Sequence, residues 1–388
     1  MKQSEKMSLP NGWLMKTVGD VCLRGSSNVS QNQLENEVGD YPIFGASGLI
    51  KNVSFYHQEK PYLSIVKDGS GFGRVTKMNA YTSVIGTLQY ILPKEDIDLD
   101  YLFYNLISID FKKYVQGAAI PHIYFKDYQN EPFLWMPLSE QQHIVAILDE
   151  AFAAIANAKA NAEQNLKNAK ELFESYLQGV FENKGDGWEK KTLKELTTHL
   201  GDGLHGTPKY TLEGDYYFIN GNNLTDGVIE FKSSTKRVSF EEYNKHKKNL
   251  TDRTILVSIN GTLGNVAFYN NEKIILGKSA CYFNMKEGID KNYIKYVLSS
   301  PYFLKYAHKE ATGATIKNVS LKTMRDFIVP LPSLKQQHVI VQKLDALSDE
   351  TKKLESIYQT KINDLEELKK SVLQKAFSGE LKTAKALV

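Results

Sequence analysis

The chain repeats one sequence pattern over most of its length. Residues 117–123 (GAAIPHI) return 196 residues later as residues 313–319 (GATIKNV), and Leu148 returns at the same offset as Leu344. A repeat with so long a period predicts two copies of one structural unit within a single chain.

Further matches lie upstream and downstream of this segment at slightly different offsets. Because the offset changes, the two copies differ in length inside, while the segments around them keep their sequence. This predicts that the segments flanking each domain share one structure, whereas the interiors of the two domains differ. The matched residues are Trp13, Lys16 and Thr17 with Trp188, Lys191 and Thr192, Tyr101 and Tyr104 with Tyr293 and Tyr296, and Gln141-Gln142-His143 with Gln336-Gln337-His338.

Each copy combines a mixed domain with a long helix. Residues 62–66 and 254–259 are β-rich runs bounded by Gly and Asn turns, which predicts strands. Residues 101–109 and 293–298 predict apolar helices. We therefore expect an α+β/α chain with a first α/β domain at 1–138, a first long helix at 139–182, a second α/β domain at 183–332, and a second long helix with a C-terminal tail at 333–388.

The two long helices carry matched apolar stripes with alternating steps of three and four residues, interrupted at Lys159, Thr351 and Lys361. A helix packed on its own domain also shows such a stripe. Two matched stripes separated by a folded domain favour an antiparallel coiled coil with pseudo-twofold symmetry. We expect Ser139 and Ser333 to cap the helices. The pairing residues are expected to be Leu148, Phe152, Ile155, Leu166 and Phe173 with Leu344, Leu347, Leu354, Leu365 and Leu368.

Composition excludes some classes of protein. The two cysteines, Cys22 and Cys281, lie far apart, so neither a disulfide framework nor a zinc cluster is expected. No segment approaches the ~18 unbroken apolar residues of a membrane span. We expect a cytoplasmic chain with no membrane contact. The net charge of +3 is only a weak indication of a nucleic-acid partner.

The residues that open the two long helices carry a family resemblance. Pro137-Leu138-Ser139-Glu140-Gln141-Gln142, followed by Ile144, Val145, Leu148 and Asp149, occurs twice in similar form, and this run resembles the specificity subunits of type I restriction-modification systems. Residues 203–210 (GLHGTPKY) and 257–264 (VSINGTLG) are similar to segments of target recognition domains in this family.

This resemblance implies that the two α/β domains are target recognition domains, each reading one half of a split target on double-stranded DNA. It implies that the paired helices set the gap between the halves and dock two modification (methyltransferase) subunits. A restriction (motor-nuclease) subunit would join them. The resemblance also implies that this chain binds no cofactor, and that S-adenosylmethionine, ATP and Mg belong to the partner subunits.

Polar loops supply the candidate DNA contacts. Residues 187–332 hold 21 Lys and Arg against 15 Asp and Glu, a net charge of +6, whereas residues 12–138 hold 11 against 13, a net charge of −2. Amides match adenine edges and lysines neutralise phosphates, although such loops are also common as plain solvated surface. The candidates are Gln31, Asn32, Gln33, Ser47, His205, Thr207, Lys209, Asn222 and Asn223 for bases, and Lys232, Lys236, Arg237, Lys245, Lys247 and Lys248 for phosphates.

Two other classes of function stay open: a stand-alone methyltransferase or nuclease, and a coiled-coil scaffold with no DNA role. The run Gly69-Ser70-Gly71-Phe72-Gly73 is similar to a phosphate-binding loop, but its counterpart at 260–264 (NGTLG) loses that pattern, so we expect a tight turn. The sequence has no Asn-Pro-Pro-aromatic or Asp-Pro-Pro-Tyr run, which an amino-methyltransferase would show by resemblance. We expect no catalytic residue and no metal site.

Overall fold

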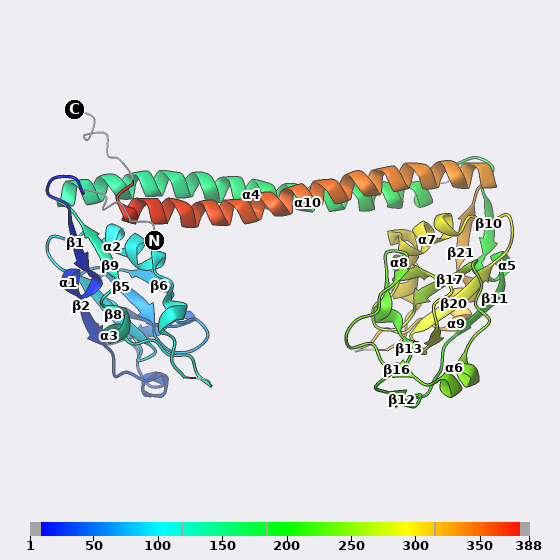
Figure 1. Ribbon diagram of the computed structural model, residues 1–388, viewed down its shortest axis with the longest axis horizontal. Coiled ribbons are helices and arrows are strands. Elements are labelled where there is room, and N and C mark those ends of the chain that lie inside the picture. The colour runs from blue at the N-terminus through cyan, green and yellow to red at the C-terminus, as the bar shows by residue number, and fades with distance from the viewer. Residues whose placement is uncertain (1–8, 118, 184, 314–315, 381–388) are drawn as a thin grey trace, which may run out of the picture. The chain divides into compact units, whose positions relative to one another are not determined.

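The computed structural model describes residues 9–117, 119–183, 185–313 and 316–380, and it divides into two compact units. Unit 1 is Met1–Glu163 with Thr360–Val388, and unit 2 is Gln164–Gln359. Each unit combines one globular module with one half of each long helix (Figure 1). Three positions of the sequence repeat, namely Ala118, Ala314 and Thr315, lie outside the described residues.

Both modules are built on the same four-stranded antiparallel sheet. The strand order β2-β8-β5-β6 in unit 1 corresponds to β11-β20-β17-β18 in unit 2. The strands predicted at 62–66 and 254–259 are the buried strands β5 and β17. Their bounds are β2 Cys22–Ser26, β5 Tyr62–Val66, β6 Val75–Met78, β8 Leu88–Pro93, β11 Thr197–Asp202, β17 Thr254–Ser258, β18 Val266–Phe268 and β20 Ala280–Met285.

A short antiparallel pair of strands closes each module where it meets its long helix. In unit 1 this pair is β1 (Leu14–Thr17) with β9 (Pro132–Trp135), and in unit 2 it is β10 (Glu189–Thr192) with β21 (Ile328–Leu331). The repeated threonine at the end of the first strand caps the next helix, α1 (Val18–Val21) or α5 (Leu193–Leu196), in a reciprocal capping box with Asp20 or Glu195. This explains why Thr17 and Thr192 are matched in the sequence.

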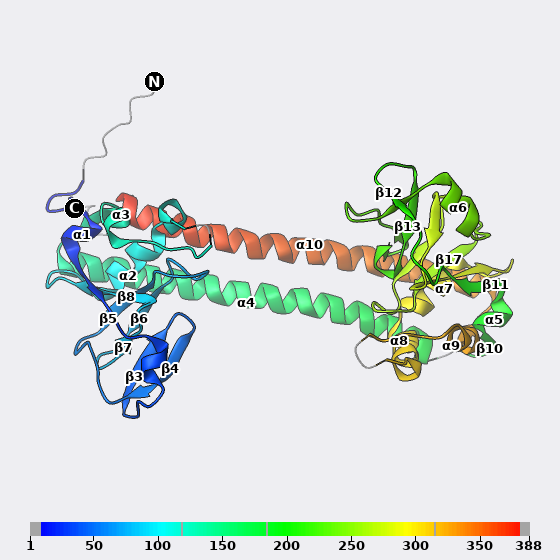
Figure 2. The same ribbon diagram turned by 90° about the horizontal axis from the view of Figure 1, so that it is seen from below.

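The second sheet of each module differs more between the two units. Unit 1 has the order β4-β3-β7, and unit 2 has β12-β16-β13-β19 and a separate hairpin, β14-β15. Figure 2 shows the β3-β4 sheet of unit 1 beside the four-stranded sheet. The bounds are β3 Tyr41–Gly45, β4 Gly48–Val53, β7 Ser83–Val84, β12 Tyr210–Thr211, β13 Tyr216–Ile219, β14 Leu224–Thr225, β15 Val228–Ile229, β16 Arg237–Val238 and β19 Ile274–Leu276.

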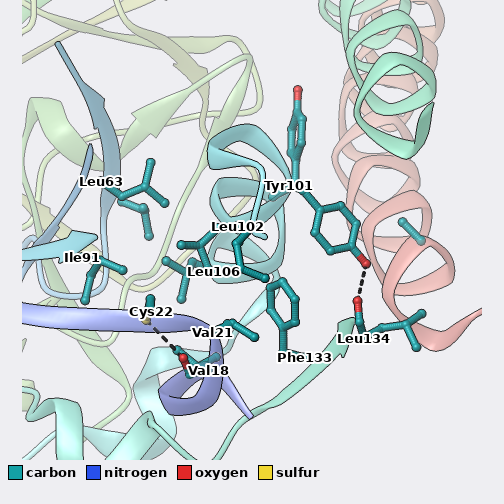
Figure 3. Packing of buried hydrophobic residues seen from close by; sticks show 14 of the residues in the cluster. Val18, Val21, Cys22, Leu63, Ile91, Tyr101, Leu102, Leu106, Phe133 and Leu134 are labelled. Carbon is teal, nitrogen blue, oxygen red and sulfur yellow. Dashed lines mark hydrogen bonds between the residues drawn. The ribbon is translucent and has the colours of Figure 1, made fainter. Parts of the chain in front are cut away.

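One apolar helix of each module, α2 (Leu99–Ser108) or α7 (Lys291–Ser299), packs in the core beside the long helices. In unit 1, Leu102 and Leu106 lie among the buried residues of the first sheet, and the Tyr101 hydroxyl donates to the Leu134 carbonyl at 2.7 Å (Figure 3). Tyr293 makes the same bond to Pro330 in unit 2. The remaining helices are η1 Gln31–Leu34, η2 Phe111–Tyr114, α3 Phe125–Tyr128, η3 Gly221–Asn223, α6 Phe240–His246, α8 Pro301–Glu310 and α9 Leu321–Asp326.

The long helices are α4 (Leu138–Glu182) and α10 (Leu334–Ser378), and they pair antiparallel within each unit. In unit 1 the start of α4, at Leu148, shares a core with Leu373 near the end of α10. In unit 2 the end of α4, at Leu177, shares a core with Leu344 near the start of α10. Both views show the two helices side by side (Figures 1 and 2). The predicted fold class, two α/β domains with antiparallel long helices, is therefore confirmed.

The seam of this pairing differs in detail from the predicted stripe. Leu148, Ile155 and Leu344 are buried, and Phe152, Leu166, Phe173, Leu347 and Leu365 are half-buried, but Leu354 and Leu368 stay 40% and 48% exposed. Thr351, which the sequence treats as an interruption, is buried seven residues after Leu344. Lys159, the interruption in α4, forms an ion pair with Glu366 of α10.

Buried glutamines fasten each module to its helix. In unit 1, Gln141 Oε1 accepts from the Asp98 amide, the N-cap of α2, at 2.9 Å, and Gln141 Nε2 donates to the Met136 carbonyl at 2.8 Å. Gln337 makes the same bonds in unit 2, to the Asp290 amide and the Pro332 carbonyl, both at 2.9 Å.

These bonds correct the alignment of the repeat. Gln141 corresponds in structure to Gln337 rather than to Gln336. The sequence alignment of the two Gln-Gln-His runs is therefore one residue away from the structural alignment. The two glutamines at Gln336 and Gln337 have different roles, because Gln336 accepts from the Ser333 amide at 3.1 Å in the cap of α10. Ser333 is thus a helix cap as predicted, whereas Ser139 lies inside α4 and the prediction for it is wrong.

The two cysteines lie in the hydrophobic cores of the two units. Cys22 and Cys281 are free and buried, and burial raises the pKa of the Cys22 thiol to about 12. Their role is packing in the two cores. Of the described helices, none is both long enough and apolar enough to cross a bilayer.

We predict that Gln141→Ala lowers the stability of unit 1 by about 1–3 kcal/mol, because it leaves the buried Asp98 amide and Met136 carbonyl without partners. Calorimetric melting of the full chain measures this. The matched control is Gln142→Ala at the exposed neighbour, with an expected change within about 0.5 kcal/mol. Equal effects of the two substitutions would contradict the anchoring role.

Candidate nucleic-acid interface

The candidates of the first module lie on two exposed segments. Gln31, Asn32 and Gln33 form η1 and are exposed, but Gln33 Oε1 accepts from the Ser30 amide at 2.7 Å and so closes the turn. Ser47 is exposed in the turn between β3 and β4. In the first module, Gln31, Asn32 and Ser47 are thus the exposed candidates, whereas the side chain of Gln33 is used in the turn itself.

In the second module, His205, Thr207 and Lys209 lie on an exposed loop between β11 and β12. The imidazole Nε2 of His205 lies 2.6 Å from Asp202 Oδ2, which orients the ring while the side chain stays 72% exposed. The Lys209 amide donates to Glu242 at 3.3 Å and ties this loop to α6. The loop is therefore held at both ends with its polar side chains outward.

The two neighbouring asparagines have different environments. Asn223 is buried, its Nδ2 donates to Glu230 O at 3.0 Å and to Thr235 Oγ1 at 3.1 Å, and its Oδ1 accepts from the Asn220 amide at 3.0 Å. Asn222 is exposed beside it. The fold therefore uses the Asn223 amide internally and leaves the Asn222 amide available for a ligand.

Among the basic candidates, Lys236, Lys245 and Lys247 are exposed. Lys232 Nζ donates to Asn222 O at 2.8 Å and also lies 3.4 Å from Glu230, so its charge is partly compensated. The remaining two basic candidates are Arg237, which stacks on Tyr217 at 5.3 Å and donates to Gly214 O at 3.1 Å, and Lys248, which is half-buried.

Each module also carries an aromatic cluster that our sequence analysis missed. Tyr41 packs edge-on against Tyr56 with centroids 4.8 Å apart, and Tyr56 packs against Tyr81 at 5.2 Å. Tyr81 is 53% exposed and holds a positive φ of 56°, which is rare for an aromatic residue. Glu59, followed by burial, raises the pKa of Tyr56, so this phenol remains protonated.

The second module repeats the cluster around Tyr216, which packs against Tyr243 at 4.5 Å and Phe240 at 5.7 Å. Lys273 lies over the Tyr216 ring at 5.5 Å and brings a cation to the cluster. The signal was present in the sequence, because Gly-Asp-Tyr occurs at 39–41 and again at 214–216. That offset of 175 is the one that relates Trp13 to Trp188.

A glycine loop adjoins the candidate turn in each module. In the first, Gly69 and Gly73 have φ of +88° and +78°, and the tight turn predicted there is confirmed. The Arg74 guanidinium that follows it donates to Ala46 O beside Ser47. In the second, the glycine loop is residues 260–264, with φ of +78° at Gly261 and +82° at Gly264. The Gly264 amide donates to Ser258 O at 3.0 Å, and Gly221 beside Asn222 packs so closely on Ser258 that a Cβ would lie 2.1 Å from its hydroxyl.

The two modules differ at one position of the four-stranded sheet, next to a recess in the first module. In the first module a cavity of about 210 Å³ opens beside Ser47, and Ser64 and Thr76 from neighbouring strands help to line it. The buried Ser64 hydroxyl has no hydrogen-bond partner among the described residues. The second module has the buried Leu256 at the position of Ser64, within an apolar core. At this position the first module therefore has a hydroxyl that lines a recess, and the second module has a leucine in an apolar core.

The β14-β15 hairpin of the second module is tied to the helices of unit 2. Asp226 at its turn forms ion pairs with Lys295 of α7 and Lys352 of α10. Burial raises the pKa of Asp226, but the two lysines outweigh burial and lower it overall. The hairpin next to Asn222 is thus held by charge. The described residues contain no group of three or more His, Cys, Asp or Glu side chains placed to hold a metal ion.

Comparison with known families matches both copies of the repeat. The model described as "Type I restriction modification DNA specificity domain" matches residues 10–168 and 185–367. The type I restriction enzyme MjaVIII specificity subunit of Methanocaldococcus jannaschii is 23% identical, over 98% of this chain and 96% of that protein. The EcoDI specificity subunit of Escherichia coli is 22% identical, over 96% of this chain and 89% of its own length.

Solved structures share the fold. A chain from a structure that addresses complex assembly and conformational transition of the type I R-M system has a TM-score of 0.74 at 18% identity, with 96% of this chain and 100% of that chain covered. The HsdS subunit from Thermoanaerobacter tengcongensis has a TM-score of 0.58 at 18% identity, with 97% and 99% covered.

We predict that the two asparagines separate stability from binding. Asn223→Ala should destabilise the chain by about 1–3 kcal/mol, because it leaves buried partners unpaired. Asn222→Ala should leave melting unchanged and weaken binding to a target duplex by about 1–3 kcal/mol, the value of one base contact. Calorimetry measures the stability of both variants, and fluorescence anisotropy measures their binding to the duplex. Unchanged binding by Asn222→Ala would remove this residue from the interface.

Proposed function

Because the chain belongs to the family of type I restriction-modification DNA specificity subunits, we propose that it reads a split target on double-stranded DNA, with each module reading one half. The observation that carries this proposal is the repeat itself. The two modules share one sheet and one attachment to the helices, while the exposed segments at Ser47 and at Asn222 differ in sequence and shape. One scaffold with two different polar edges suits two different half-sites.

Affinity and sequence reading rest on different residues in this proposal. The exposed lysines of the second module, such as Lys245 and Lys247, neutralise phosphates, which positions the module on the duplex but carries no sequence information. Asn222 in the second module and Gln31 and Ser47 in the first then contact base edges. A DNA target also places the chain in the cytoplasm, with the genome.

The chain itself catalyses no step in this proposal. S-adenosylmethionine is held by the modification (methyltransferase) subunits, and ATP and Mg are used by the restriction (motor-nuclease) subunit. The sequence supports this division, because it lacks the Asn-Pro-Pro-aromatic run expected of an amino-methyltransferase. The alternatives, a stand-alone methyltransferase or nuclease and a scaffold without a DNA role, are not favoured. Methyl transfer by the isolated chain would contradict this proposal.

Two modification subunits dock on the helices, one in each unit. Unit 2 has a groove of about 520 Å³ lined by Phe173, Leu177 and Leu304, and unit 1 has one of about 440 Å³ lined by Leu373 and Phe377. Leu177 and Leu373 are partners in the sequence repeat at the offset of 196. Matched grooves suit two copies of the same partner. The parts of the long helices in unit 2 also carry exposed apolar residues, namely Leu172, Tyr176, Leu354 and Ile357.

We predict that exchange of residues 187–332 for the same domain of another family member changes one half of the target and leaves the other half intact. The sheets and attachments are common to both modules, so the new domain should fold on the existing helices. Base-resolved mapping of methylated adenines in cells that carry the modification subunit measures both halves. A change in both halves after one exchange would disprove the two-module model.

We also predict that one heptad added to each helix, near Asn161 and near Ile357, widens the gap between the half-sites. Seven residues keep the apolar seam in register and lengthen each helix by ~10.5 Å. Along the duplex this corresponds to about three base pairs at ~3.4 Å each. Methylation mapping reads the gap directly, and both half-site sequences should persist. An unchanged gap in a folded, active complex would show that the helices do not set the spacing.

A further inference from the structure

The recess beside Ser47 lies between the turn that joins β3 to β4 and one face of the four-stranded sheet. Its volume is about 210 Å³, and it is lined by residues 44–48 together with side chains of β5, β6 and β8. Ser47, Arg74 and Thr76 are exposed lining residues, so the recess is open to solvent. The other lining residues of the sheet are Ser64, Val66, Met78 and Leu88, all of them buried.

Ser64 is the buried polar residue of this recess. It has no exposed surface, and its hydroxyl has no hydrogen-bond partner among the described residues. Its cross-strand neighbour on β6 is Thr76, which lines the same recess. A buried hydroxyl without a partner costs free energy, because it has lost its bonds to water. A polar group that enters the recess would supply the missing bond.

Arg74 gives the recess a positive charge, and the described residues that line it include no Asp or Glu. One N–H of Arg74 donates to Ala46 O, which leaves further donors of the guanidinium for a ligand. Phe44, Met78 and Leu88 supply apolar surface around these polar groups. Apolar walls with a few convergent polar groups are typical of a site for a small molecule or ring.

The volume limits the size of the ligand. A cavity of about 150 Å³ accepts benzene, whereas drug-sized ligands occupy pockets of about 300–1,000 Å³. The recess therefore suits one six-membered ring with its exocyclic groups, and it is too small for S-adenosylmethionine or ATP. Pyrimidine bases are rings of this size, and each has a carbonyl oxygen that can accept from Arg74 or Ser64.

The second module has different side chains at the same positions. The strand register relates Leu256 to Ser64 and Ala267 to Thr76. Leu256 and Ala267 are buried in one apolar cluster with Leu224 of the β14-β15 hairpin. The sheet that the two modules share is thus built without these hydroxyls. A role specific to the first module accounts for them.

The recess adjoins the candidate reading turn, because Ser47 lines it. A base inside a duplex reaches such a recess only when it is turned out of the stack about its backbone. We propose that the recess binds one pyrimidine base of the first half-site in this extrahelical position. Ser64 and Arg74 donate to its carbonyl oxygens, and the apolar side chains contact its ring. This inference rests on the proposed function.

The unpartnered hydroxyl favours this exchange of partners. The recess is polar and roomy enough for water, which satisfies Ser64 in the free protein. A base replaces the water, takes over its hydrogen bond and covers the apolar walls. These gains offset part of the cost of unstacking the base. Adenine has no carbonyl oxygen, so the bound base differs from the adenine that is methylated.

The first test separates binding from folding. Because the Ser64 hydroxyl has no partner within the fold, Ser64→Ala should not lower the melting temperature. It should weaken binding to the mapped target about fivefold, the value of one hydrogen bond. Both properties are measured on the chain assembled with the modification subunits, by calorimetry and by fluorescence anisotropy.

Thr87→Val is the matched control for this substitution. The Thr87 hydroxyl is also buried and without a partner among the described residues, but Thr87 does not line the recess. Thr87→Val should therefore bind the target as wild type does. Weakening of the same size in both variants would show that loss of a buried hydroxyl, and not loss of a ligand contact, changes the affinity.

The second test detects the extrahelical base. In a series of duplexes, each purine opposite a pyrimidine of the first half-site is replaced in turn by an abasic residue. Loss of the pairing partner lowers the cost of turning that pyrimidine out, so one duplex of the series should bind wild type about tenfold more tightly than the intact target. Ser64→Leu installs the leucine of the second module in the recess and should abolish this gain.

The two half-sites are told apart by domain exchange, since the first is the one that survives exchange of residues 187–332. The same abasic series in the second half-site is the internal control. Wild type and Ser64→Leu should bind each of its duplexes with the same ratio to the intact target. If Ser64→Leu fails to fold by circular dichroism, Ser64→Ala and the wild-type series still decide the question.

The inference is overturned if Ser64→Ala binds the target as tightly as wild type, because the recess then holds water only. It is also overturned if no abasic duplex of the first half-site binds wild type more tightly than the intact target. The proposed function fails instead if wild type binds target and unrelated duplexes equally. The two failures are distinguishable, because discrimination by wild type persists when only the inference about the recess is wrong.

Discussion

The buried side-chain hydrogen bonds between each module and its long helix are the contacts on which the rest of the molecule depends. Gln141 and Gln337 each join a helix start to the N-cap of the adjacent module helix. Tyr104 and Tyr296 add hydroxyl bonds to Asp149 and Asp345 of the long helices. Burial and then the neighbouring carboxylate raise the pKa of both phenols, so they remain donors. A module attached by a flexible loop alone could not hold a half-site at a fixed distance along DNA, and these bonds remove that freedom.

Local patterns in the sequence predicted the elements well. The β-rich run at residues 62–66 gives the strand Tyr62–Val66, and the stripes of three- and four-residue steps give helices that begin at Leu138 and Leu334. These signals are local, since they arise from the period of one element. The seam between the helices was less predictable. Thr351 is buried although it is polar, because it lies seven residues after the buried Leu344 on the same face of α10, and this position rather than its hydropathy determines its burial.

The candidate site was predictable in location but not in detail. The loops around Ser47 and Asn222 are polar and exposed, as the composition indicates. The sequence alone, however, does not show that Asn222 is exposed and Asn223 is buried. Only the fold shows that Asn223 bonds three internal partners. The Gln-Gln-His match was displaced by one residue for a related reason. The two copies of the repeat share their contacts, but two adjacent residues of the same type, such as Gln336 and Gln337, can make different contacts.

The unequal charge of the two modules bears on how a target is found. The second module has a net charge of +6 with exposed lysines on and beside α6, whereas the first module has −2. Long-range attraction to phosphates governs the rate of encounter, and it acts on any sequence. The basic module would therefore make first contact and keep the protein on the duplex while it slides. In the proposed function the acidic module gains little from nonspecific DNA, so the second module contributes most of the attraction during the search and the first module contributes mainly through the bases that it reads.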